Sequence, residues 1–99
     1  MQLYIEPEAE EDIRDLEKSH QEYVLNRLQE LRDQPTGHKD SDTIRIRDRQ
    51  VFKYVMKKDN TRGGKDYRAI YDINGENINI IAIFNRDQGY NKKELNNRL

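Results

Sequence analysis

Four side chains in the second half of the chain have the types needed to act on a phosphodiester: Lys53, Arg68, Arg86 and Tyr90. RNA carries its own nucleophile, the 2′-hydroxyl. Its cleavage therefore needs a base for that proton, cations for the pentavalent phosphate and an acid for the leaving oxygen. Among other cations a lysine can act as a base, while arginine offers phosphate a planar set of donors. Tyrosine can donate a proton or stack on a nucleobase. The set predicts RNA cleavage, although a basic sheet could equally bind nucleic acid or an acidic partner.

Positive charge gathers around these residues, although the whole chain has a net charge of −1. Residues 1–34 contain ten acids and four bases, whereas residues 35–99 contain nine acids and fourteen bases. This asymmetry suits a polyanion bound on one side of the molecule, and the alternative is a solvated charged face without a ligand. We expect five bases of the stretch 45–68 to contact RNA: Arg45, Arg47, Lys57, Arg62 and Lys65.

Several residue types and segments that other functions require are absent. The chain has no cysteine, which excludes disulfides, thiolate metal sites and cysteine nucleophiles. His20 and His38 stand apart without metal-ligand spacing, so we expect neither a metal nor another cofactor. No run approaches about 18 apolar residues and no signal peptide precedes the first expected strand, so we expect a cytoplasmic protein without a membrane contact. The length predicts one domain spanning residues 1–99.

Arg68 lies in the clearest structural signal of the chain, a β-hairpin. Two runs rich in β-branched residues flank Asn74-Gly75, a strong signal for a two-residue turn. With Asn74 and Gly75 as the loop, Tyr71 would face Ile78 across the two strands. One side of the hairpin would then form the core, through Tyr67, Ala69, Tyr71, Ile73, Ile78, Ile80, Ala82 and Phe84. Arg68 would lie on the other side, among Ile70, Ile81 and Ile83.

The first third of the chain predicts a short strand and two helices. Residues 2–5 read as the strand, and Pro7 suits the first position of a helix. Residues 19–22, Ser-His-Gln-Glu, fit a capping box that would begin a second helix at Ser19. Its apolar stripe would consist of Val24, Leu28 and Leu31, widened by Leu25.

From residue 43 the apolar pattern alternates, which indicates β-structure. Phe52, Tyr54 and Met56 would face the core, so that Lys53, Val55 and Lys57 point the other way. Whether residues 48–50 divide this stretch into two strands stays open. Residues 58–64 predict a basic loop, and residues 92–99 a short terminal helix.

These elements predict an α+β domain in the order β-α-α-β-β-β. Two N-terminal helices would pack on one face of a small antiparallel sheet, with a short helix expected at the C-terminal end. The face opposite the two helices would present Lys53 and Arg68 together, with Arg86 at a strand end beside them.

Three runs resemble the RelE/ParE superfamily of toxins from type II toxin–antitoxin pairs. They are Phe-Lys-Tyr-Val-Met at 52–56, Asp-Tyr-Arg-Ala-Ile-Tyr at 66–71, and Asn-Arg at 85–86 leading to Tyr90. The resemblance implies a metal-free endoribonuclease that cuts mRNA in the ribosome, with a cognate antitoxin as protein partner. By this resemblance Lys53, Arg68 and Arg86 match catalytic cations, and Tyr90 matches a tyrosine that stacks on the cleaved nucleotide.

The sequence also departs from the RelE pattern at two positions. Val55 stands where some members carry a second lysine, and Asn85 where many carry a histidine. ParE-type members share the fold and the Tyr-Arg strand but inhibit DNA gyrase without cutting RNA. Two alternatives to a ribonuclease therefore stay open: a gyrase inhibitor, and a catalytically inactive module that binds nucleic acid or the antitoxin.

Overall fold

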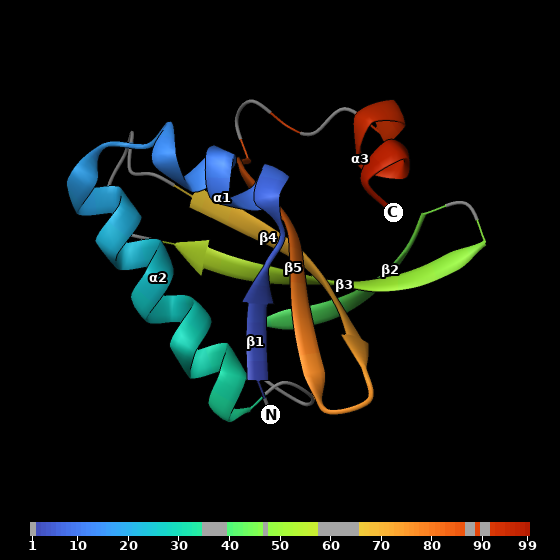
Figure 1. Cartoon of the computed structure of the whole chain (residues 1–99). Coiled ribbons are helices and arrows are strands. Elements are labelled where there is room, and N and C mark those ends of the chain that lie inside the picture. Colours follow the sequence, from blue (N-terminus) through green and yellow to red (C-terminus); the bar gives the residue numbers. More distant parts are fainter. Residues whose placement is uncertain (1, 35–39, 47, 58–65, 87–88, 90–91) are drawn as a thin grey trace.

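The computed structural model describes residues 2–34, 40–46, 48–57, 66–86, 89 and 92–99. In these residues the elements, with their bounds, are β1 (Gln2–Ile5), α1 (Pro7–Arg14), α2 (Lys18–Asp33), β2 (Ser41–Ile46), β3 (Arg49–Lys57), β4 (Asp66–Asn74), β5 (Asn77–Asn85) and α3 (Lys92–Arg98) (Figure 1). The α+β class is confirmed. The stretch whose division stayed open forms two strands, β2 and β3, so the sheet has one strand more than the expected order.

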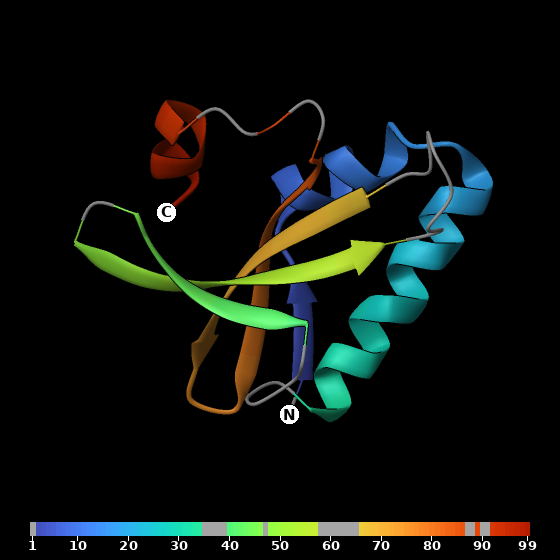
Figure 2. The ribbon, with the colours of Figure 1, turned by 180° about the vertical axis from the view of Figure 1, so that it is seen from behind.

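The five strands form a single sheet in the order β1-β5-β4-β3-β2. β2 to β5 pair with their neighbours antiparallel, whereas β1 pairs parallel to β5, so the expectation of an antiparallel sheet is wrong at this edge. β1 and β5 are far apart in the sequence, so no tight hairpin forces these two neighbours to be antiparallel. α1 and α2 cover that face, and α3 lies on the other (Figures 1 and 2).

Both N-terminal helices form as predicted, but the second begins one residue earlier than expected. Pro7 opens α1, with Glu8 and Glu10 in a first turn that favours negative charge. α2 begins at Lys18 after Glu17, which makes no side-chain cap, so the predicted capping box at Ser19 is wrong. The predicted stripe of α2 is buried, but Leu25 is 40% exposed and does not widen it.

The β4–β5 hairpin has a different register from the predicted one. Asn74 pairs with Asn77, which leaves Gly75 and Glu76 as the turn, and Gly75 takes the positive φ of 63° that the turn needs. Tyr71 faces Ile80, so its predicted pairing with Ile78 is wrong. This shift of two residues keeps every side chain near the turn on its predicted face, because side chains alternate with a period of two.

A β-bulge then changes the faces in the second half of β5. The register shifts by one residue between Ile70 and Tyr71, so that Ile70 pairs with Ala82. Beyond the bulge Ile83 packs against α1 and α2, while Ala82 and Phe84 lie on the side of α3. The predicted core positions of Ala82 and Phe84, and the predicted outer position of Ile83, are therefore wrong.

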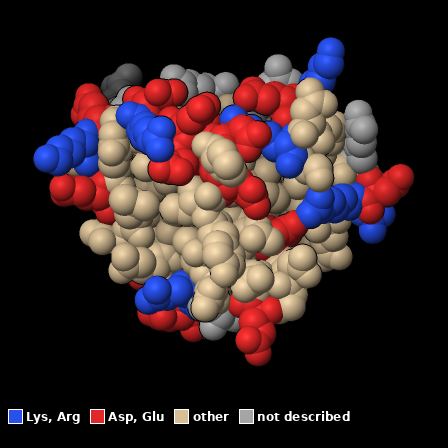
Figure 3. Space-filling view, viewed as in Figure 1, with Lys and Arg blue, Asp and Glu red and all other residues tan. Residues whose placement is uncertain are grey.

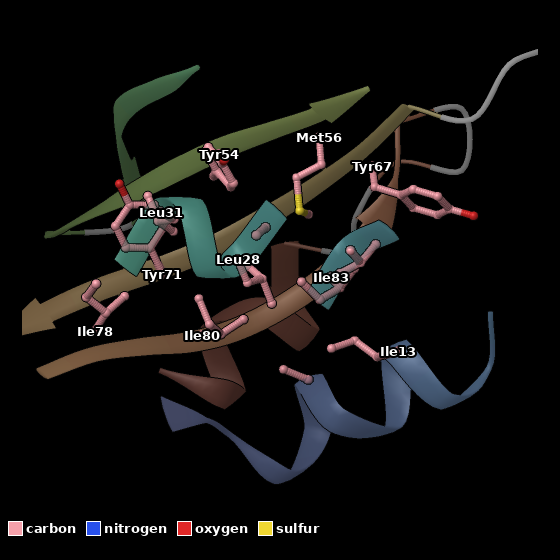
Figure 4. Close-up of a cluster of buried hydrophobic side chains, with 13 residues drawn as sticks. Ile13, Leu28, Leu31, Tyr54, Met56, Tyr67, Tyr71, Ile78, Ile80 and Ile83 are labelled. Atoms are coloured by element: carbon pink, nitrogen blue, oxygen red, sulfur yellow. The ribbon is translucent and has the colours of Figure 1, made fainter. Parts of the chain in front are cut away.

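Apolar side chains are buried on both faces of the sheet. The larger cluster joins α1 and α2 to the sheet and contains Tyr54, Tyr71, Leu28 and Leu31 (Figure 4). The smaller cluster lies under α3 and contains Val51, Ile70, Ile81, Leu95 and others. α3 thus covers part of the face that carries Arg68. No helix in the described part of the chain is long and apolar enough to span a membrane.

Candidate functional site

The structure places Lys53 and Arg68 on the face opposite α1 and α2, as predicted. Lys53 pairs with Ile70, and Arg68 pairs with Val55 on one side and Phe84 on the other. Ile70 belongs to the cluster under α3, and side chains two residues apart on a strand share a face, so Arg68 and Lys53 point to the same side as Ile70.

Arg68 is held by a carboxylate two residues before it on β4. Its Nε donates to Oδ1 of Asp66 at 3.1 Å, and its Nη2 donates to Oδ2 at 3.2 Å. The Arg68 side chain is only 15% exposed and that of Asp66 12%. Two-point pairing of this kind fixes both the position and the plane of a guanidinium.

Arg86 approaches the same carboxylate from the end of β5. Its backbone N–H donates to the carbonyl of Asp66 at 2.8 Å, and its Nη1 lies 3.8 Å from Oδ2 of Asp66. The Arg86 side chain is 68% exposed. Two guanidiniums therefore share one carboxylate, which leaves one positive charge in excess at this point of the surface.

Two lysines of β3 flank this group. Lys57 pairs with Asp66 and Lys53 with Ile70, so each lies on a diagonal from Arg68, which pairs with Val55 between them. Diagonal neighbours in a sheet lie about 7–8 Å apart, within reach of long side chains. Neither lysine forms an ion pair with a described residue. The described site thus consists of Arg68 and Arg86 at Asp66, with Lys53 and Lys57 on the two diagonals from Arg68.

The remaining predicted site residues do not join this group in the described structure. Arg45 pairs with Gln50 and alternates with Ile44 and Ile46, which belong to the α3 side, so Arg45 points to the opposite face. The structure therefore does not bring Arg45 together with Arg68 and Lys53. Four other predicted site residues lie outside the described residues: Arg47, Arg62, Lys65 and Tyr90. Val55 pairs with Arg68, and Asn85 ends β5.

Asp66 is the site residue that the sequence reading missed. A signal existed, because Asp66 and Arg68 are two apart on a predicted strand and must share a face. The link from Asp66 to Arg86 had no such signal. It depends on the bulge, which brings the end of β5 opposite the start of β4.

On the face covered by α1 and α2, His20 and Tyr67 line a cavity. His20 Nδ1 lies 2.7 Å from the Tyr67 hydroxyl, and the His20 side chain is 13% exposed. Burial raises the pKa of Tyr67, and the charge of Glu17 adds to this. The cavity measures about 450 Å³ and its wall includes Asp12, Asp15 and Glu17. Three carboxylates make this cavity unsuited to a phosphate.

The described residues contain no group of three or more histidines and carboxylates that could hold a metal ion. The described site itself offers the chemistry of clustered cations: charge neutralisation by arginine and proton transfer by lysine.

Comparison with known proteins gives one family, and two of the similar solved structures are described below. The family model described as the ParE toxin of type II toxin–antitoxin system, parDE, matches residues 3–90. A mutant of the E. coli toxin RelE in the free state is 19% identical, with a TM-score of 0.63 over 98% of this chain and 90% of that one. The intact E. coli RelBE toxin–antitoxin complex matches at 19% identity and a TM-score of 0.50, over 83% of this chain and 92% of that one. No curated protein matches the chain.

Proposed function

Since this chain belongs to the ParE toxin family, within the RelE/ParE superfamily of type II toxins, we propose that it is an endoribonuclease that cleaves mRNA on the ribosome. The observation that carries the proposal is the gathering of Arg68 and Arg86 at one carboxylate, with Lys53 and Lys57 beside them. A phosphodiester held there would meet several cations at once, as a pentavalent transition state requires.

In the proposed reaction the 2′-hydroxyl of the substrate attacks the adjacent phosphorus. Lys53 takes the proton of that hydroxyl, and Arg68 and Arg86 stabilise the charge that builds on the phosphoryl oxygens. The bond to the 5′-oxygen breaks, and that oxygen takes a proton from water, while the proton held by Lys53 returns to the solvent. The products are a 2′,3′-cyclic phosphate and a 5′-hydroxyl. Tyr90 is proposed to stack on the cleaved nucleotide.

The proposal is tested by primer extension on translated mRNA with the wild type and single variants. Arg68→Ala and Arg86→Ala should each lower the cleavage rate about 10²–10³-fold, the range for losing one preorganised donor. Arg49→Ala is the matched control, because Arg49 lies on the same side of the sheet but pairs with Asp72, away from Asp66. Its rate should stay close to that of the wild type. Equal rates for all four proteins would refute the proposed site.

A second candidate function is inhibition of DNA gyrase without RNA cleavage. It is favoured by the family model that matches, which describes ParE toxins, and by Val55, which leaves one lysine where some RelE-type members have two. Growth arrest with intact mRNA and accumulated gyrase–DNA complexes would select it. Binding of RNA or antitoxin with neither effect would indicate an inactive module.

The proposed partner of this toxin is an antitoxin with an acidic segment. One similar structure is a toxin–antitoxin complex, and the described cations offer a counterpart for carboxylates. Its apolar anchors cannot be the isoleucines of the sheet, because Ile70, Ile81 and Ile83 are buried. The partly exposed Val55 and Phe84, on either side of Arg68, remain for that role. An adjacent reading frame that encodes a small acidic protein would support this partner. Adjacent reading frames that encode no such protein would count against it.

A further inference from the structure

We propose that Asp66 is a positioning residue, which turns the Arg68 guanidinium so that its end-on edge faces the substrate phosphate. The inference deepens the proposed function and rests on it for the identity of the substrate. Asp66 would touch neither the nucleophile nor the leaving group, and would act through Arg68 and Arg86.

The hydrogen bonds between Asp66 and Arg68 decide which edge of the guanidinium is free. A guanidinium has five N–H donors in one plane. Asp66 occupies the side edge, through Nε at 3.1 Å and Nη2 at 3.2 Å. Three donors remain, and two of them, on Nη1 and Nη2, form the end-on edge. No described residue accepts a hydrogen bond from that edge, so none of them competes with a phosphate that places two oxygens in its plane.

Burial makes this orientation effective. The paired side chains of Arg68 and Asp66 are mostly buried, and a hydrogen bond to a charged group is stronger where the surroundings exclude water. Val55 and Phe84 lie on either side of Arg68 in the sheet. Without the carboxylate, the arginine would keep its charge and its place on the strand, but it would sample several rotamers.

The charge of Asp66 argues against a role in binding alone. A carboxylate between two arginines lowers the positive potential that attracts RNA, so a surface built only to bind RNA would be better without it. A carboxylate that orients a donor can instead raise the rate of the chemical step. Loss of this charge should therefore change affinity and rate in opposite directions, which a merely structural role would not do.

The test compares Asp66→Asn with Asp72→Asn. Asp72 is a matched control, because it lies on the same strand and face, is also paired with an arginine (Arg49) and accepts a hydrogen bond from Asn79. Affinity is measured with an mRNA that carries a 2′-O-methyl group at the cleavage site on programmed ribosomes, and rate by single-turnover cleavage of the unmodified mRNA. Asp66→Asn should bind as tightly as the wild type or tighter and cleave up to about 10²-fold more slowly. Asp72→Asn should change neither quantity.

Thermal unfolding of both variants separates this effect from a loss of stability. The inference is overturned if Asp66→Asn cleaves at the wild-type rate, or if its affinity and rate fall together as its folded fraction falls.

A wild type that never cleaves mRNA would refute the proposed function without deciding the role of Asp66. The ¹⁵N-NMR signal of the Arg68 Nε–H then decides it. Slow exchange of this proton in the wild type and in Asp72→Asn, but not in Asp66→Asn, supports the orientation. An exchange rate that is equal in all three proteins overturns it.

Discussion

At the scale of single residues, the open choice is which lysine would take the proton of the 2′-hydroxyl. Lys53 and Lys57 lie on opposite diagonals from Arg68. Lys53 is partly buried beside Ile70, whereas Lys57 is exposed at the end of β3. A base must stay within hydrogen-bond reach of the proton that it removes, which favours the more restricted side chain. We therefore keep Lys53 as the proposed base and Lys57 as a contact to phosphate.

The two lysines can be separated by the pH dependence of cleavage. Lys53→Ala should flatten the rise of the rate with pH, because the group whose deprotonation limits the reaction is gone. Lys57→Ala should weaken substrate binding but keep the shape of the pH profile. The measurement is single-turnover cleavage over the pH range in which the ribosome stays intact. A flat profile for Lys57→Ala and an unchanged one for Lys53→Ala would exchange the two roles.

The sequence predicted the described part of the site well where strand alternation decides it. Lys53 and Arg68 lie on one face because each belongs to a strand whose apolar neighbours must face the core. The separation of Arg45 from these two residues could not be predicted, because positive charge alone does not tell the face of a strand. The pairing of Asp66 with Arg86 joins residues 20 positions apart and depends on a register that composition does not give.

At the scale of elements, the ion pair between Asp12 and Arg98 fixes α3 beside the part of β5 that has no pairing with β1. The pairing of β1 with β5 ends at Ile5 and Ile80. Just beyond, the carboxylate of Asp12 accepts the N–H of Ile83 at 3.0 Å, and Arg98 donates to the carbonyl of Ile81 at 3.2 Å. Arg98 also pairs with Asp12 at 2.7 Å. One ion pair therefore satisfies the bulged end of β5 and links α1 to α3.

Loss of this ion pair should loosen α3 and the second half of β5. Arg98→Ala leaves the Asp12 carboxylate and the Ile81 carbonyl without this donor, which should cost about 1–3 kcal/mol of the free energy of unfolding. Hydrogen exchange should become faster at residues 81–83 and 95–98, and urea unfolding gives the energy. The control is Arg14→Ala, whose pair with Glu10 is exposed and should contribute less than about 0.5 kcal/mol. Unchanged exchange at the bulge in Arg98→Ala would show that other contacts hold α3.

The elements themselves could be predicted more fully than their pairing. β1, the apolar stripe of α2 and the core side of β3 follow from local patterns and agree with the structure. The turn at Gly75 and the bulge at Ile81 do not follow from local patterns, because both satisfy backbone groups through tertiary contacts. Asp12 and Arg98, which bind the bulge, lie 71 and 15 residues from Ile83 along the chain. No local pattern could have indicated them.

At the scale of the whole molecule, the sheet separates two kinds of surface. Asp and Glu side chains gather over α1, on the face seen in Figure 3. The described cations of the candidate site lie on the other face. A polyanion would therefore approach from one side, steered by charges of both signs.

The same sheet buries three tyrosines against α1 and α2, which makes the whole fold sensitive to alkali. Tyr54 and Tyr71 are fully buried and Tyr67 nearly so. Burial raises the pKa of each, and it raises that of Tyr54 to about 12, although the Arg27 guanidinium 5.2 Å from its ring acts in the opposite direction. In the unfolded chain a tyrosine has a pKa of about 10. The folded state therefore retains a proton that the unfolded state loses.

The free energy of unfolding should stay constant with respect to these groups below about pH 10 and fall between about pH 10 and 12. Tyr54 alone should contribute a slope of about 1.4 kcal/mol per pH unit in that window. Urea unfolding measured from pH 8 to 12 tests this, with tyrosinate absorbance as a second signal. Tyr54→Phe keeps the ring against Arg27 and removes the hydroxyl, so its slope should be shallower by that amount. Tyr4→Phe is the control, because Tyr4 is about half exposed on β1. A slope that Tyr54→Phe leaves unchanged would mean that the Tyr54 hydroxyl does not keep its proton in the fold.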